Sequence, residues 1–144
     1  MSSPVTGVST VANDFNWLVN RFANNTAGVI AAIAVSADGL LMAVSSDLPQ
    51  QDADRLAAIS SAVLGLANGV SDSYPMGPPD KIIIEMQQGY LLVCTISIGC
   101  SLGVLATKQA GLGAIAYEMA VFANRASSVL NPQLIEELKN TVGQ

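Results

Sequence analysis

Two hydrophobic periods divide the first part of the chain into a helix and a hairpin. Four apolar residues recur at helical spacing and predict a helix over residues 11–24: Val11, Phe15, Leu18 and Phe22. The next segment, residues 28–36, is apolar on both alternating sets, which is typical of a strand covered on both faces. Asp38 and Gly39 then predict a tight turn, and residues 40–46 return as the second strand.

The second part of the chain again consists of a helix followed by strands. A long helix is expected from about residue 51 to 71, with five residues as its core stripe: Leu56, Ile59, Val63, Leu66 and Val70. Three prolines and a glycine make residues 72–79 a loop. Three strands are then expected at residues 81–87, 90–98 and 102–107.

Two helices are predicted at the C-terminal end. The first spans residues 112–129, and its apolar face is expected to consist of Leu112, Ile115, Met119, Phe122 and Val129. Asn131 and Pro132 are typical of a helix cap and a first helical residue, and a short amphipathic helix follows at residues 133–140.

The order of elements predicts an α/β (α+β) fold in which one five-stranded, mostly antiparallel sheet is flanked by helices. The order is helix, two strands, helix, three strands, helix. We expect a flexible N-terminus over residues 1–9, one domain over residues 10–131, and a short C-terminal helix within residues 132–144.

The composition of the chain indicates that the surface of the protein carries few charges. Apolar residues make up 51% of the chain and charged residues only 12%, whereas a soluble domain usually has roughly 25% charged residues. Part of the surface should therefore be covered by a partner or by a second copy. The net charge of −5, without clustered cations, argues against nucleic-acid binding and against an anionic membrane surface. No apolar leader or spanning segment is evident, so a cytoplasmic location is expected, with no insertion into the membrane.

The residue types for catalysis are scarce. The chain has no histidine, which removes the commonest general base and metal ligand. Asp52 and Asp54 at a helix start fit interaction with the helix dipole better than metal binding. The Gly-x-Gly at Gly111 and Gly113 lacks the lysine or third glycine of a phosphate loop. We expect no enzymatic activity, no catalytic residues, no metal and no cofactor.

The outer face of the long helix is the first candidate interaction surface. If Leu56 is set at zero, the positions at about 160 to 240° carry only small side chains after residue 54. We call them the small-residue ridge: Ala58, Ala62, Gly65 and Gly69. Glycine costs a helix up to about 1 kcal/mol relative to alanine, so close packing against another helix or protein would account for the ridge. The alternatives are a poorly optimised alanine-rich surface, or contact with another helix of the same chain.

Two further candidates lie elsewhere. Trp17 points away from the stripe of the first helix and is either an interface residue or partly shielded by a loop or the last helix. The strand at residues 81–87 would pair with a second copy if it is a sheet edge. Antiparallel pairing centred on Ile83 sets Lys81 opposite Glu85 of the other copy, which is a favourable cross-strand pair.

Residues 29–67 resemble the Roadblock family of dynein-light-chain-like proteins. The resemblance rests on the Asp38-Gly39-Leu40 turn, the Leu56-Ala57-Ala58 helix start, the strands of residues 90–106, and Tyr117-Glu118-Met119 in the following helix. With these later segments included, the resemblance covers about residues 11–130. It is greatest to bacterial members that are encoded beside a sensor kinase and a small Ras-like GTPase.

The resemblance implies a profilin-like fold and a homodimer in which edge strands join into one continuous sheet. It also implies that the second long helix engages a small Ras-like GTPase, and a sensor kinase of the same gene cluster is a further partner by this reasoning. The leading hypothesis is a non-catalytic GTPase-binding regulator or scaffold in a bacterial signalling complex. A nucleotide-independent structural scaffold and a small-molecule sensor module remain as alternatives.

Overall fold

A computed structural model of the chain describes residues 10–45 and 48–142, and this part folds as a five-stranded sheet with four helices. The strands are β1 (Val29–Ser36), β2 (Leu41–Val44), β3 (Lys81–Met86), β4 (Gly89–Ser97) and β5 (Cys100–Thr107). The helices are α1 (Thr10–Asn25), α2 (Gln50–Ser73), α3 (Leu112–Ser127) and α4 (Pro132–Val142). The predicted fold class and element order are confirmed, with element ends shifted by a residue or two.

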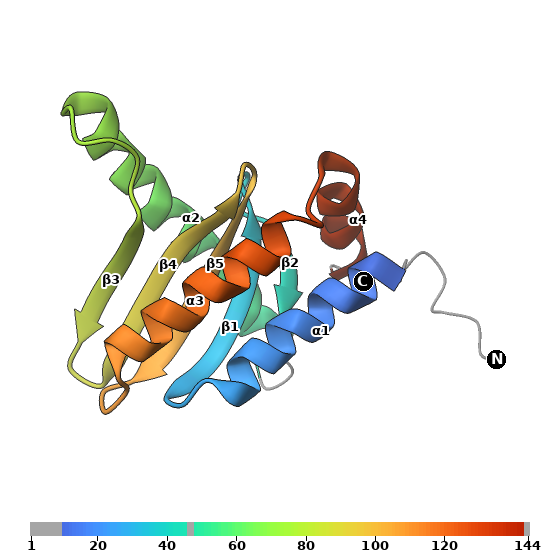
Figure 1. The fold of residues 1–144 in the computed structure, drawn as a ribbon, viewed down its shortest axis with the longest axis horizontal. Coiled ribbons are helices and arrows are strands. Elements are labelled where there is room, and N and C mark those ends of the chain that lie inside the picture. The colour runs from blue at the N-terminus through green and yellow to red at the C-terminus, as the bar shows by residue number, and fades with distance from the viewer. Residues whose placement is uncertain (1–9, 46–47, 143–144) are drawn as a thin grey trace.

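The sheet has the strand order β2-β1-β5-β4-β3, and each neighbouring pair is antiparallel. Helices α1, α3 and α4 cover one face, and α2 lies on the other (Figure 1). The central strands β1, β5 and β4 are therefore buried from both sides, which explains why they are apolar at consecutive positions.

Two cores result from this layering. The larger core lies under α1, α3 and α4 and includes Phe15, Phe22 and Phe122, whose rings meet at tilted or edge-on angles. The smaller core lies under α2 and is built from Ile33, Val93 and their neighbours. The sheet thus separates the surface of α2 from the surface formed by α1 and α3.

The predicted hairpin turn is confirmed. Gly39 has a φ of +83°, a conformation that other residues rarely adopt. The Ser36 hydroxyl interacts with the carboxylate of Asp38, and its oxygen accepts a hydrogen bond from the Leu40 amide at 3.1 Å. These contacts hold the turn that joins β1 to β2.

Two predicted stripes are wrong at their ends. In α1 the sheet-facing side passes through Ala12 and Val19 together with Phe15 and Phe22, while Val11 is 45% exposed. The end of α3 at Ser127 leaves Val129 outside the helix and partly exposed. Small residues let α1 lie closer to the sheet than larger side chains would, and they carry little weight in a hydrophobic pattern.

The short helix α4 packs on the sheet instead of extending into solvent. Leu134 and Leu138 are buried in the same core as α1 and α3. Asn131 caps the helix, since its Oδ1 accepts a hydrogen bond from the Leu134 amide at 2.7 Å. The predicted flexible N-terminus, residues 1–9, lies outside the described residues. None of the helices in the described part of the chain is long and apolar enough to cross a membrane.

Candidate partner-binding surfaces

The side of α2 that faces the sheet is not the one predicted. The buried residues of this helix are Ala53, Leu56, Ala57 and Ser60. Most of the predicted core stripe is on the surface instead: Ile59 is 44% exposed, Leu66 76% and Val70 53%. Leu56 is buried as predicted, but the other buried residues of the helix are small, and the hydrophobic period does not detect them.

Helical geometry explains the shift. With Leu56 again at zero, the buried positions are centred at about 50°, whereas the predicted stripe lies at about 280 to 360°. The small-residue ridge at about 160 to 240° therefore points away from the sheet. Ridge and displaced stripe form one broad exposed face, and no charged residue occurs on α2 between Leu56 and Ser71. We call it the α2 face.

The ridge itself is open. Ala58, Ala62, Gly65 and Gly69 are all exposed. A Cβ added at Gly65 or Gly69 would meet no heavy atom of the described chain within 4 Å. The expectation that the ridge could contact another helix of the same chain finds no such contact at these two glycines within the described residues. The space beside Gly65 and Gly69 is thus free of the described part of the chain.

The second half of α2 extends beyond the sheet. Figure 1 shows the C-terminal turns of α2 and the loop to β3 projecting from one corner of the molecule. Tyr74 and Met76 in this loop are 58% and 78% exposed. A shallow groove lined by Val70, Met76 and Ile82 connects α2 to the first residues of β3. The α2 face and the strand β3 are therefore neighbouring parts of one surface.

The strand β3 lies at an edge of the sheet, as the edge-pairing hypothesis requires. It pairs only with β4, so its outer side has no strand neighbour among the described residues. The opposite edge differs, because β2 has only four residues and lies next to α4. A long open edge invites pairing with another strand, and a short covered edge does not.

The three candidate residues of β3 share one face of the sheet. Lys81, Ile83 and Glu85 alternate with Ile82 and Ile84, which pack against the core under α2. Ile83 is 42% exposed.

Both charged residues of β3 already have partners within the chain. Lys81 Nζ lies 3.9 Å from the carboxylate of the neighbouring Asp80. Glu85 forms an ion pair with Lys108, whose Nζ also donates to the Met86 carbonyl at 3.1 Å. The hydrogen bond to Glu85 is the main reason that the pKa of Lys108 is raised above its usual value. A contact between Lys81 and Glu85 of another copy would thus compete with existing pairs.

Trp17 is on the opposite side of the molecule from the small-residue ridge. It lies on α1, and its side chain is 56% exposed. The guanidinium carbon of Arg21 lies 5.0 Å from the centre of its ring, which is a cation–π contact. The structure therefore does not bring Trp17 together with Ala62, and any partner of Trp17 uses a surface other than the ridge.

The two cysteines are buried, and Arg55 lies beside an acidic residue. Burial raises the pKa of Cys94 to about 11 and that of Cys100 to about 12, so both thiols stay protonated near neutral pH. Arg55 at the start of α2 lies 4.0 Å from Asp52. In the described residues, no group of three or more acidic residues or cysteines is placed to hold a metal ion.

The described part of the chain thus combines an α+β sheet with an uncharged helix face and one open sheet edge. The sequence model of the Roadblock/LC7 domain family matches residues 15–106. The chain belongs to this family, so the resemblance seen in the sequence is confirmed. None of the curated proteins in the comparison matches it.

Solved structures give the same fold. A Roadblock/LC7 domain from Streptomyces avermitilis superposes with a TM-score of 0.73 at 27% identity, covering 76% of this chain and 92% of that one. MglB from Myxococcus xanthus gives 0.74 at 13% identity, with 81% and 94% covered. Profilin IA from Acanthamoeba castellanii gives 0.57 at 12% identity, with 77% and 94% covered. The last two likenesses show the fold alone, and they confirm its profilin-like character.

Proposed function

We propose that this chain is a homodimeric, non-catalytic regulator that binds a small Ras-like GTPase through the α2 face, within a bacterial signalling complex. The observation that carries the proposal is the exposure of Ile59, Leu66 and Val70 beside an uncharged ridge. Burying a large aliphatic side chain stabilises a complex by about 1.5–3 kcal/mol. Exposed apolar side chains of this kind are more stable when a protein partner buries them than when they remain in water.

The dimer part of the proposal rests on the neighbouring edge. Pairing of β3 with β3 of a second copy would continue the sheet and bring the two α2 helices to the same side of the assembly. The groove between Val70 and Ile82 would then lie close to the junction. The two α2 faces together would form one extended apolar surface, which is larger than a single helix offers.

The binding part of the proposal is tested with a purified small Ras-like GTPase, loaded with GDP or with a non-hydrolysable GTP analogue. We expect the affinities for the two forms to differ tenfold or more, about 1.4 kcal/mol. Ala62→Glu should abolish binding, because it places a charge in the centre of the ridge. Ala114→Glu is the matched control, since Ala114 is an exposed alanine on α3 across the sheet.

The outcomes separate the competing functions. Equal affinity for the two nucleotide states, with loss of binding in Ala62→Glu, would identify a nucleotide-independent scaffold. An absence of binding to both forms would reject the GTPase as partner. A small-molecule sensor would instead show a rise in melting temperature with a metabolite, which a pure protein-binding module does not.

A further inference from the structure

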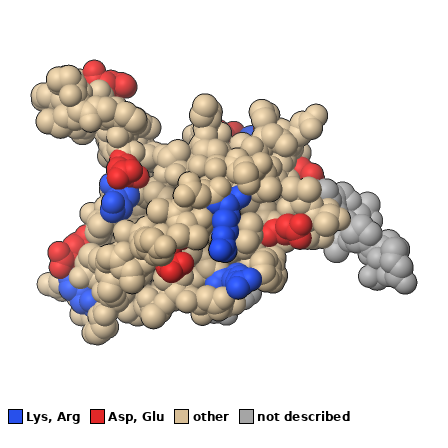
Figure 2. Space-filling view, viewed as in Figure 1, with Lys and Arg blue, Asp and Glu red and all other residues tan. Residues whose placement is uncertain are grey.

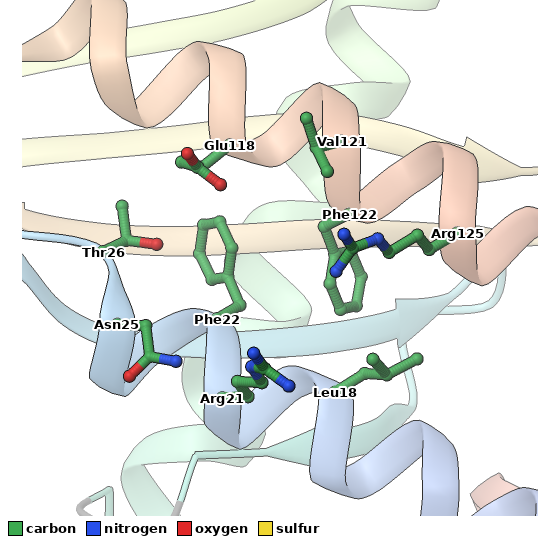
Figure 3. Close-up of a pocket in the computed structure, with 9 residues that line it drawn as sticks. All are labelled: Leu18, Arg21, Phe22, Asn25, Thr26, Glu118, Val121, Phe122 and Arg125. Carbon is green, nitrogen blue, oxygen red and sulfur yellow. The ribbon is translucent and has the colours of Figure 1, made fainter.

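A second concave surface lies on the opposite face of the molecule, between α1 and α3. Figure 3 shows this groove, which has a volume of about 220 Å³. Its apolar lining comes from Leu18, Phe22, Val121 and Phe122. The rings of Phe22 and Phe122 meet edge-on, with centroids 5.8 Å apart, and both side chains are nearly buried. The groove thus has a rigid apolar floor.

The positive charges at this groove differ from the others in the protein in their ion pairing. The chain has six lysine and arginine residues. Four of them have a carboxylate within ion-pairing distance: Arg55, Lys81, Lys108 and Lys139. The other two, Arg21 and Arg125, have no ion pair with any described residue, and both line the groove.

The two arginines come from different helices and reach the same space. Figure 3 shows the side chain of Arg125 extending from α3 over Phe122, and that of Arg21 extending from α1 on the other side of the rings. Positive side chains also gather near the middle of this face in Figure 2, within a largely uncharged surface. Glu118 lines the groove as well, so two guanidinium groups against one carboxylate leave one net positive charge.

We propose that the groove between α1 and α3 binds an acidic segment of a partner protein that also carries apolar side chains. Carboxylates of the segment pair with Arg21 and Arg125, for which the guanidinium fork is well suited. An apolar side chain between them rests on the Phe22 and Phe122 rings. Trp17, stacked on Arg21, extends the apolar contact along α1.

The chemistry of the groove favours a peptide over other anions. Nucleic acid presents a run of phosphates, and two arginines on a protein of net charge −5 neutralise too few of them. A flat anionic membrane would be repelled by the same net charge and would not enter a groove between two helices. A short segment meets only the local positive charge. Because the groove and the α2 face lie on opposite sides of the sheet, the two surfaces can be occupied at the same time.

The test uses the full chain, labelled with ¹⁵N, and a short synthetic peptide that alternates glutamate with leucine and phenylalanine. A second peptide has glutamine in place of every glutamate. We expect saturable binding of the acidic peptide, with chemical-shift changes confined to α1 and α3. The double variant Arg21→Gln/Arg125→Gln should bind at least tenfold more weakly, and Arg55→Gln on α2 should leave the affinity unchanged. Glu118→Gln should strengthen binding, because it removes the one negative charge of the lining.

Three results would overturn the proposal. The glutamine peptide could bind as well as the acidic one, or the shift changes could fall on α2, or Arg55→Gln could weaken binding as much as the double variant. Inorganic phosphate and phosphatidylserine vesicles are tested alongside. Arginine-dependent binding of either, without binding of the acidic peptide, would show that the groove recognises a different kind of anion. The melting temperature of each variant establishes that it is folded.

Discussion

Close approach of α2 to the sheet depends on one residue of β5. Gly103 lies on the central strand, paired with Ile33 on one side and Val93 on the other. A Cβ at this position would lie 2.6 Å from Ser60 Oγ and 3.3 Å from Ile33 Cγ1. Gly103 and Ser60 of α2 are thus complementary in size, and this contact lets the helix lie close to the sheet.

Alanine substitutions at two glycines should have opposite effects on stability. Gly103→Ala should destabilise the protein by about 1–3 kcal/mol, since the added methyl group overpacks the contact with Ser60. Gly65→Ala should stabilise it by up to about 1 kcal/mol, because the site is helical and has free space around it. Urea unfolding monitored by circular dichroism measures both.

The same pair of variants also tests the role of the ridge. If Gly65 is present to allow close approach of another protein, Gly65→Ala should weaken self-association or GTPase binding while it raises stability. A more stable variant with unchanged binding would show that the ridge glycines do not serve an interface.

At the scale of elements, an ion pair connects the C-terminal helix α4 to the hairpin of β1 and β2, which is distant from it in the sequence. Lys139 Nζ lies 3.3 Å from Asp38 and 2.8 Å from Glu136. The hydrogen bond from Ser36, and after it the contacts with Lys139, hold the pKa of Asp38 below its usual value. The ion pair adds a polar contact to the apolar anchors Leu134 and Leu138.

This attachment predicts a dependence on pH. A carboxyl group whose pKa is lower in the folded state stabilises the fold above its unfolded pKa of about 3.9 and loses that contribution as the pH falls through the folded value. Asp38→Asn should therefore be less stable than the original protein at neutral pH, and the difference should vanish in strong acid. Unfolding curves at a series of pH values measure it, and hydrogen exchange should show faster opening of α4.

Asp72→Asn is the control, because Asp72 is an exposed acid with no ion pair among the described residues. Its stability should follow that of the original protein across the whole pH range. A constant difference between Asp38→Asn and the original protein, down to the lowest pH, would contradict the assigned role of Asp38.

At the scale of the whole molecule, the sheet separates the two proposed binding surfaces. The α2 face and the open edge β3 adjoin each other, while the arginine-lined groove lies across the sheet. A dimer formed through β3 would carry two copies of each surface. Such an arrangement suits a protein that connects partners, because binding on one side does not block the other.

The proposed dimer predicts a specific pattern among edge variants. Ile83→Asp should weaken self-association at least tenfold, because it introduces a charge at the centre of the paired strands, and sedimentation equilibrium measures this. Ile98→Asp is the control, since Ile98 is 99% exposed in the turn between β4 and β5. Equal dimer affinity in the two variants would exclude β3 as the interface.

The register has its own test. Lys81→Glu should weaken the dimer, because it places like charges opposite each other, by roughly 0.2–1 kcal/mol for each pair. Adding Glu85→Lys should restore part of the loss. If the second change deepens the loss instead, the strands pair in another register.

The sequence by itself determined the order of the elements, the hairpin turn, the cap of α4 and the family. The elements, the turn and the cap depend on local chemistry: side-chain period, glycine at positive φ, and hydrogen bonding within a few residues. The family came from the resemblance of the sequence to known members. The sequence also indicated that α2 has an unusual outer face. The absence of histidine argued against catalysis and metal binding, and the absence of clustered cations argued against nucleic-acid binding. Neither argument needed knowledge of the fold.

Only the tertiary structure decided which side of α2 is buried and how the candidate residues are grouped. The hydrophobic period placed Leu66 and Val70 in the core, but both are exposed, because small residues of α2 face the sheet and the second half of the helix extends beyond it. The groove of Arg21 and Arg125 could not be seen in the sequence, because the two residues are far apart along the chain and meet only when α1 packs beside α3. Contacts of this kind depend on the shapes of surfaces brought together by folding, and a local pattern carries no information about them.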